Sequence, residues 1–421
     1  MGMKRGKFMK KKSNVIIFFV LCVAIILIGV VLFLIYKESN KKNISSKPNI
    51  SSDFSVNFIR MSNLNIGQEN YMISPYSVEV ALSLVREGSN GTTLEELERI
   101  VPERNIKDLS IKDKLNVANG LFVKNSYKSS VKNDYVGRLK AEYNSDVLYD
   151  EFKSPNKIND WVKKETNGMI KKVFDELDEN FVLAIVNAVA MEESWNSKFE
   201  CTSTTKDEFS LIDGSKMDVS MMNKMFSDSI SYYENDSMKS VIMPYNMYNK
   251  NGKVVKEDGE QLEFIGILPN NDIDEYINDM SFETIQDIDK NKVSAENKSI
   301  NVSLPKFKFD YNFKKFKDTL IDMGINKIFN IGADFSNMLD DGDYSIDEAV
   351  HKSYIEVDEE GTKASAVTGF TLKETAMIED DFINIIFNKP FIFLIKDVNS
   401  DEILFFGVVY EPSKYEENKC E

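Results

Sequence analysis

Residues 351–390 constrain the fold of this chain more than any other segment. Within it, Ile355–Asp358 alternates apolar and polar residues like a half-buried strand, and a mostly apolar run begins at Ile385 and continues to Phe393. Between the two lie Gly361, small or β-branched residues at 364–368, and a polar stretch with little periodicity. A strand that enters an existing sheet must fit its side chains into a packed interior. The segment therefore predicts a long exposed loop whose first part can become a strand.

Composition limits the class of protein. The chain has 421 residues, of which 42% are hydrophobic, so a large core is expected and disorder over most of the chain is not. The net charge of −16 argues against nucleic-acid binding, because neutralising phosphates requires clustered Lys and Arg. Residues 1–42 carry a net +8, so the remaining residues carry −24. We interpret this acidic remainder as a solvated surface rather than an acidic binding face.

The N-terminal segment predicts a membrane anchor. Val15–Tyr36 contains no charged residue and is long enough to cross a bilayer as a helix. A basic cluster precedes it, which predicts the N-terminus inside the cell and the acidic body outside. A cleavable signal peptide usually has a shorter apolar core and a small-residue cleavage site, so a signal anchor is favoured over secretion after signal cleavage. The expected location is the cell membrane, with a single span and an extracellular body.

The predicted organisation has five parts. They are a basic cytoplasmic segment at 1–13, a transmembrane signal anchor at 14–36 that contacts the lipid bilayer, a polar linker at 37–52, a folded domain at 53–415 and a polar tail at 416–421. Within the domain, the residue patterns predict helices at 54–61, 75–87 and 156–174, and strands at 117–124, 145–149 and 302–313.

Cysteine and histidine are too few to build a stapled fold or a metal centre. Cys22 falls in the predicted membrane span, which leaves Cys201 and Cys420 as the one possible extracellular pair. Because Cys420 follows Pro412 in the polar tail, we expect no structural disulfide and a fold that depends on its core. With a single histidine, the sequence predicts no metal site, and it suggests no cofactor.

Several motifs, in the same order along the chain, resemble those of the serpin family. The segment EEGTKASAVT at 359–368 is similar to the family's hinge pattern, and NYMISPYSVEVAL at 70–82 is similar to its N-x-x-x-S-P-x-S-x-x-x-A-L signature. INDWVKKETNGMI at 158–170 and LPKFKFDYNFKKFKDTLIDMGINKIF at 304–329 match further family segments. The resemblance covers about residues 54–412. It implies an α+β fold with three β-sheets, about eight or nine helices and an exposed reactive-centre loop.

The resemblance also implies three groups of site residues. The hinge, where the loop leaves the central sheet, comprises Glu359, Glu360, Gly361, Thr362, Ala364, Ser365, Ala366 and Thr368. The shutter, a hydrogen-bonded cluster beneath the sheet, comprises Ser74, Ser77, Asn187 and His351. The breach, at the upper end of the sheet, comprises Trp195 and a salt bridge between Lys306 and Glu359.

The hinge composition favours a loop that can insert. Gly361 gives backbone freedom, and the uncharged Thr362 is the first side chain that must face inward. With a strand period of two, Ala364 and Ala366 face the same way, while Lys363 faces solvent.

By resemblance, the protein is not an enzyme but a suicide inhibitor whose partner is a serine or cysteine protease, and it acts as a monomer. The protease cleaves the loop, forms an acyl-enzyme and is trapped when the loop inserts. Counting from Glu359 in the family register places the reactive bond between Thr375 and Ala376. Counting back from the following strand places it near Glu379, and Met377 is a further alternative.

Two alternatives stand beside this interpretation. A non-inhibitory binding or structural role remains open, because Met191-Glu192-Glu193 replaces the Phe-Lys-Gly of the family pattern. A Ser-His-Asp hydrolase is disfavoured, since His351 is the one histidine and no G-x-S-x-G segment is present.

Overall fold

Long apolar strands of the C-terminal third build the largest sheet. In the computed structural model, which describes residues 54–101, 103, 108–177, 181–340, 344–346, 349–362, 382–417 and 420, β17 and β18 are buried along their whole length. Such strands read as continuous apolar runs because both faces are covered. The strand order is β1-β18-β17-β10-β9-β8-β11. The bounds are β1 Tyr71–Ile73, β18 Ile403–Val409, β17 Phe391–Asp397, β10 Glu260–Pro269, β9 Met238–Tyr248, β8 Ser231–Glu234 and β11 Val293–Ser294.

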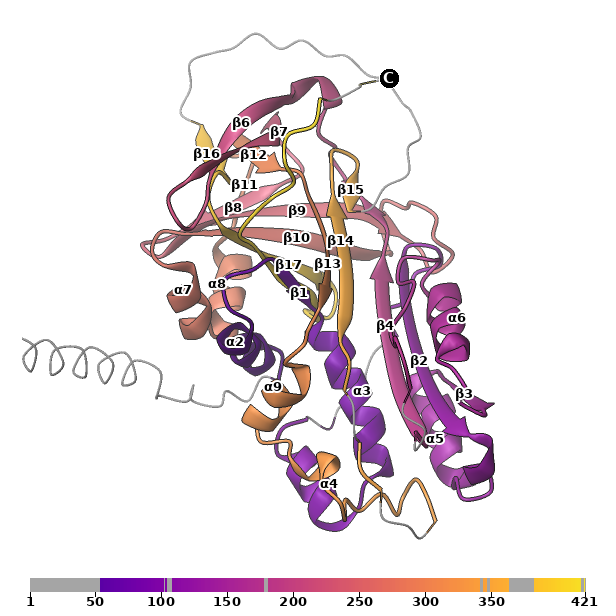
Figure 1. The fold of residues 1–421 in the computed structure, drawn as a ribbon. Helices are drawn as coiled ribbons and strands as arrows, with labels where there is room; N and C mark the ends of the chain where they lie inside the picture. Colours follow the sequence, from indigo (N-terminus) through magenta and orange to yellow (C-terminus); the bar gives the residue numbers. More distant parts are fainter. Residues whose placement is uncertain are drawn as a thin grey trace, which may run out of the picture. The chain divides into compact units, whose positions relative to one another are not determined.

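A second, four-stranded sheet lies at the end of the molecule where β6 and β7 are labelled (Figure 1). Its order is β16-β12-β7-β6, with bounds β16 Ile383–Ile386, β12 Ile300–Pro305, β7 Lys216–Phe226 and β6 Thr204–Ser210. The single strand predicted at 302–313 is wrong, because the chain changes sheets at Lys306. Its N–H donates to the carbonyl of Ser220, while β13 starts at the next residue in another sheet.

The central sheet consists of two ladders that are continuous through the chain. One has the order β3-β2-β4 and the other β13-β14-β15-β5. The bounds are β3 Ser145–Asp150, β2 Leu115–Lys124, β4 Leu183–Met191, β5 Glu193–Ser194, β15 Gly361–Thr362, β14 Lys352–Val357 and β13 Phe307–Asn312. Because β5 follows β4 after a single residue, the two ladders adjoin along the chain, and we refer to them together as the central sheet. Hydrogen bonding among the described residues nevertheless gives four sheets rather than the three expected, since no ladder joins β4 to β14.

Eight α-helices and three short 3₁₀ turns are present among the described residues. They are α2 Phe54–Ile66, α3 Pro75–Gly88, α4 Gly91–Glu98, α5 Asn133–Tyr143, α6 Asn156–Glu165, α7 Ile273–Asp279, α8 Phe282–Asn291, α9 Phe316–Asp322, η1 Asn125–Tyr127, η2 Cys201–Ser203 and η3 Lys327–Phe329. The helix predicted at 156–174 ends at Glu165, because Asn167 and Gly168 adopt positive φ angles of 50° and 80°.

Helix α3 matters most for the site, since it runs alongside the lower parts of β14 and β4 (Figure 1). It begins where predicted. The Ser74 side chain accepts a hydrogen bond from the N–H of Ser77 at 3.1 Å, and Pro75 occupies the first helical position, where its missing N–H costs nothing. The helix buries Val78, Leu82 and Val85 in the core.

The C-terminal tail contradicts the expectation that no disulfide forms. Cys201 in η2 and Cys420 are joined by a disulfide across a sequence separation of 219 residues. The tail reaches this position because it pairs with β7: Lys414 forms a bridge with Val219, and the N–H of Tyr415 donates to Asp218 at 2.9 Å. These backbone contacts are not visible as a pattern in a polar sequence, so the expectation of an unpaired tail was wrong.

The predicted membrane span lies outside the described residues. Within the described part of the chain, which begins at residue 54, no helix is long and apolar enough to cross a membrane.

Candidate functional site

The first residues of the hinge form a short strand inside the central sheet. Thr362 pairs with Val357 of β14 on one side and with Glu193 of β5 on the other. Gly361 faces Ser194 so closely that a Cβ atom would lie 2.1 Å from the carbonyl oxygen of Glu193. Only glycine permits this approach.

Thr362 points inward, as its position in the pattern predicts. It is 4% exposed, and its hydroxyl lies 2.6 Å from the hydroxyl of Tyr245. The buried polar atom is thus satisfied without a charge. The remaining hinge residues and the predicted reactive-bond residues lie outside the described residues, namely Ala364, Ser365, Ala366, Thr368, Thr375, Ala376, Met377 and Glu379.

The breach residues come together around the turn that leads into the hinge. Lys306 Nζ lies 2.8 Å from Glu359 Oε1, and the Thr204 hydroxyl donates to the same oxygen at 2.7 Å. Burial alone would raise the pKa of Glu359, but these hydrogen bonds outweigh it, so the pKa is lowered and the carboxylate is ionised. The bridge holds the turn against the strands beside it.

Trp195 supports the same turn from below. Its ring stacks on Tyr245 with centroids 4.7 Å apart, and its indole N–H donates to the carbonyl of Asp358 at 2.9 Å. Its backbone N–H donates to the carbonyl of Glu360 at 2.9 Å. The predicted breach set of Trp195, Lys306 and Glu359 is therefore assembled, with backbone contacts that no motif specified.

The shutter residues are linked through the start of α3. His351 Nε2 accepts the N–H of Ser74 at 3.0 Å, and the Ser77 hydroxyl bonds to Asn187 Oδ1. Asn187 donates in turn to Asn119 Oδ1 at 2.5 Å, a contact that sequence reasoning missed because nothing in the residue pattern distinguishes Asn119 from Asn116 in the same strand. The network connects the β14 side of the sheet to the β4 side by way of the helix beneath it.

His351 is a neutral, buried member of this network. Burial lowers its pKa to about 4, and its Nε2 acts as an acceptor, so the imidazole carries its proton on Nδ1. Its ring packs against Phe58 and Phe316, with centroids 6.4 and 5.5 Å away. The hydrogen bond that its side chain makes among the described residues is the one from the N–H of Ser74.

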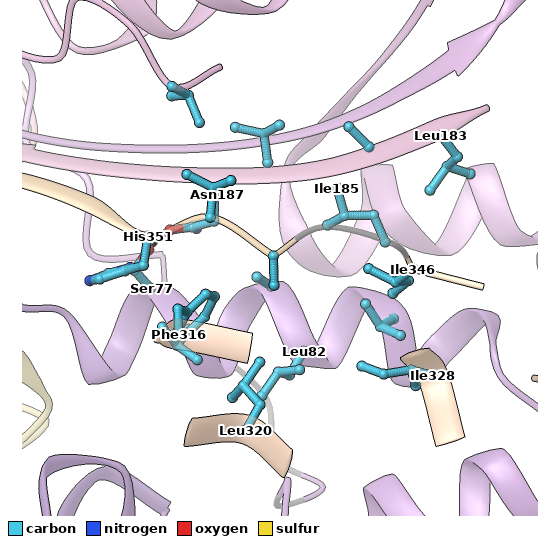
Figure 2. Close-up of a pocket in the computed structure, with 18 of the residues that line it drawn as sticks. Ser77, Leu82, Leu183, Ile185, Asn187, Phe316, Leu320, Ile328, Ile346 and His351 are labelled. Atoms are coloured by element: carbon cyan, nitrogen blue, oxygen red, sulfur yellow. Dashed lines mark hydrogen bonds between the residues drawn. The ribbon is translucent and has the colours of Figure 1, made fainter. Parts of the chain in front are cut away.

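Below the hinge, the central sheet stands open over a cavity of about 640 Å³. It is lined by β4, by the described residues of 344–353 and by α3. Figure 2 shows Ser77, Asn187 and His351 toward one end and Ile328, Ile346 and Leu183 toward the other. Among the described residues, β4 pairs with β2 alone and β14 pairs with β13 and β15 alone, so no ladder joins β4 to β14. The cavity thus has a strand on each side, a polar end and an apolar end.

Comparison with known proteins identifies this architecture. The family model described as "Serpin (serine protease inhibitor)" matches residues 49–412. The chain belongs to the serpin family. It is 31% identical over 389 residues to an uncharacterised serpin-like protein of Thermococcus kodakarensis, covering 87% of this chain and 86% of that protein.

The names of two further relatives state a function or a conformational state. The leukocyte elastase inhibitor of Xenopus tropicalis is 30% identical over 388 residues, covering 85% of this serpin and 97% of that protein. Among solved structures, the native state of the thermophilic serpin tengpin is 30% identical with a TM-score of 0.72, covering 87% of this chain and 96% of that chain. Serpins are mostly protease inhibitors rather than enzymes.

Proposed function

We propose that this serpin inhibits serine or cysteine proteases by inserting its own cleaved loop into the central sheet. The observation that carries the proposal is the hinge: Gly361 and Thr362 already lie as a strand between β5 and β14. Directly below them the sheet is open over the cavity lined by β4 and α3. A sheet that holds the first two residues and is open beneath them is suited to take up more of the loop.

The chemistry of the cavity matches that of the loop when the hinge register is continued. Thr362 lies opposite Glu193, so the same antiparallel register brings Thr368 opposite Asn187, at the polar end of the cavity. Phe370 then falls on the same face, at the apolar end. Thr368 would thus meet polar side chains and Phe370 apolar ones, which supports insertion in this register.

The reaction uses the protease's own machinery. The protease nucleophile attacks the carbonyl of Thr375, the amine of Ala376 leaves with a proton, and an acyl-enzyme remains attached to Thr375. Insertion of residues 363–375 as a strand would then carry the enzyme roughly 40 Å along the sheet. A bond at Met377 or Glu379 instead would lengthen the inserting segment.

The test is incubation of residues 53–421 with subtilisin, elastase and trypsin, followed by denaturing gels and intact mass spectrometry. We expect a boiling-resistant covalent complex and a released fragment that starts at Ala376. A fragment that starts elsewhere would keep the mechanism and move the reactive bond. Clean cleavage without a complex, and with no rise in the melting temperature of the cleaved protein, would overturn the proposal in favour of a non-inhibitory binding role.

We also propose that residues 14–36 tether the serpin domain to the outer face of a cell membrane. The uncharged run Val15–Tyr36 and the basic cluster before it support this topology. The full chain is then expected in the membrane fraction after an alkaline wash, with the domain open to added protease on intact cells. Recovery of a shortened, soluble domain would favour secretion after cleavage.

A further inference from the structure

Glu193 places a carboxyl group where the serpin pattern has glycine, and the group is buried beside the hinge. The residue is 1% exposed and lies directly opposite Thr362 in the β5–β15 pair. Both of its carboxyl oxygens are buried without a hydrogen bond of good geometry among the described residues, and its polar neighbours are the Tyr248 hydroxyl and the Lys114 ammonium. A buried carboxyl group that lacks such bonds is costly when it is ionised and much less so when it is neutral.

Among the described residues, the cation that acts on Glu193 is Lys114, and its other neighbours are neutral. From the turn before β2, Lys114 contributes its charge, but its ammonium lies over the ring of Tyr248, 5.2 Å from the centroid. From β9, Tyr245 and Tyr248 face the carboxyl group, and Tyr245 shares its hydroxyl with Thr362. Burial dominates and raises the pKa of Glu193 to about 8, although Lys114 and Tyr248 act in the opposite direction.

The carboxyl groups of residues 358–360, in the turn before the hinge, have partners other than Glu193. Glu359 pairs with Lys306, and Glu360 pairs with Lys198. The carboxylate of Asp358 accepts the N–H groups of Glu360 and Gly361, although burial raises its pKa. Glu193 is therefore the carboxyl group whose protonation bears directly on the pairing between β5 and β15.

We propose that Glu193 is a positioning residue for the hinge: in its neutral form it holds Gly361 and Thr362 between β5 and β14, and in its ionised form it releases them. Releasing the two residues opens the space beside β5 to water, which can then solvate the carboxylate. Because residue 361 is glycine, the backbones of the hinge and of Glu193 lie in direct contact, with no side chain between them at this point.

The direction of the pH effect follows from linkage. With the hinge released, Glu193 meets water and titrates near its ordinary pKa of 4.5, whereas with the hinge docked its pKa is about 8. Between these values docking takes up a proton, so the ratio of docked to released hinge falls by up to about tenfold for each pH unit gained. Below this range docking is fully favoured, and above it the ratio no longer changes.

Release changes the reach of the loop. Two residues withdrawn from the sheet return about 7 Å of extended chain to the loop. A longer loop presents its reactive bond more readily to a protease, so raising the pH through this range is expected to speed complex formation. This last step rests on the proposed function, whereas the docking equilibrium does not.

The docking equilibrium can be followed through Trp195, whose indole N–H is bonded to the hinge turn at Asp358. In residues 53–421 carrying Trp161→Phe, Trp195 is the remaining tryptophan, and its emission would be recorded from pH 5 to pH 9. We expect the emission of Trp195 to change with pH in the Trp161→Phe protein, and to show no such change when Glu193→Gln is added. Glu192→Gln, a change at the adjacent and more exposed residue, is the matched control and should keep the transition.

A transition that survives unchanged in Glu193→Gln would belong to another group, such as Asp358, and would overturn the proposal. If Glu193→Gln does not fold, Glu193→Ala serves the same purpose, because it also removes the ionisable group. The association rate of a trapped protease with wild type, divided by its rate with Glu193→Gln at each pH, cancels the protease's own titration and should rise with pH. If no protease is trapped, the emission of Trp195 still decides the docking claim on its own.

Discussion

Replacing Thr362 by glutamate is expected to convert the protein from an inhibitor into a substrate. Thr362 is 4% exposed and lies opposite Glu193, whose carboxyl group is itself buried. A second carboxyl group at this position would have to enter the sheet beside the first, without a cation in contact. An unpaired buried charge costs about 3 kcal/mol or more, so insertion should slow by at least about 100-fold. Water would then deacylate the protease before it is displaced.

The measurement is the partition of the loop between cleaved protein and covalent complex on denaturing gels. Two variants provide controls. Thr362→Val keeps the size without a charge, and Lys363→Glu changes the charge at the next residue, which is expected to face solvent in the inserted strand. Both should still trap protease. Undiminished trapping by Thr362→Glu would mean that insertion does not carry this side chain into the sheet.

The breach, the shutter and the first residues of the hinge could be predicted because each depends on residue types at fixed positions in recognisable motifs, whereas the hinge beyond Thr362 lies outside the described residues. The contacts that join them could not. Lys306 reaches Glu359 because the chain changes sheets at that residue, whereas the alternation of 302–313 looks like one uninterrupted strand. A period-two pattern reports which face a residue takes but not which sheet it joins.

Local conformation explains the second difference between prediction and structure. The apolar spacing continues beyond Glu165, which is why a helix was predicted as far as residue 174. Asn167 and Gly168 both leave the helical region, and the Thr166 hydroxyl then bonds to the carbonyl of Val162 and receives the N–H of Ile170. The polar and glycine residues at the break decided the outcome over the apolar pattern around them.

The docked hinge itself also lay beyond sequence reasoning. The motif indicates that Thr362 can enter the sheet, but not that it is already between β5 and β14 before cleavage. In that state Thr362 pairs with Glu193 and its hydroxyl contacts that of Tyr245, and these two residues come from two other strands. Docking of the first two residues and opening of the sheet below them are consequences of long-range packing.

Removing the disulfide is the prediction with the second largest expected effect. We expect Cys201→Ser combined with Cys420→Ser to lower the free energy of unfolding by about 3 kcal/mol, since a closed loop of this length strongly restricts the unfolded chain. The closed loop spans a sequence separation of 219 residues. The chain-entropy estimate alone would be about 5 kcal/mol, and relaxation of the native tail reduces it.

We expect the tail to leave β7 when the bond is lost. Among the described residues its other contacts are a few backbone hydrogen bonds, two hydrogen bonds between the Ser220 hydroxyl and the backbone of Glu416, and the ring of Tyr415 near Lys206. Melting curves of residues 53–421 with and without reductant would test both effects. Reductant should lower the melting temperature of the wild type and leave the double-serine variant unchanged. Identical melting of the oxidised wild type and the double variant would show that the backbone contacts of the tail stabilise the domain without the bond.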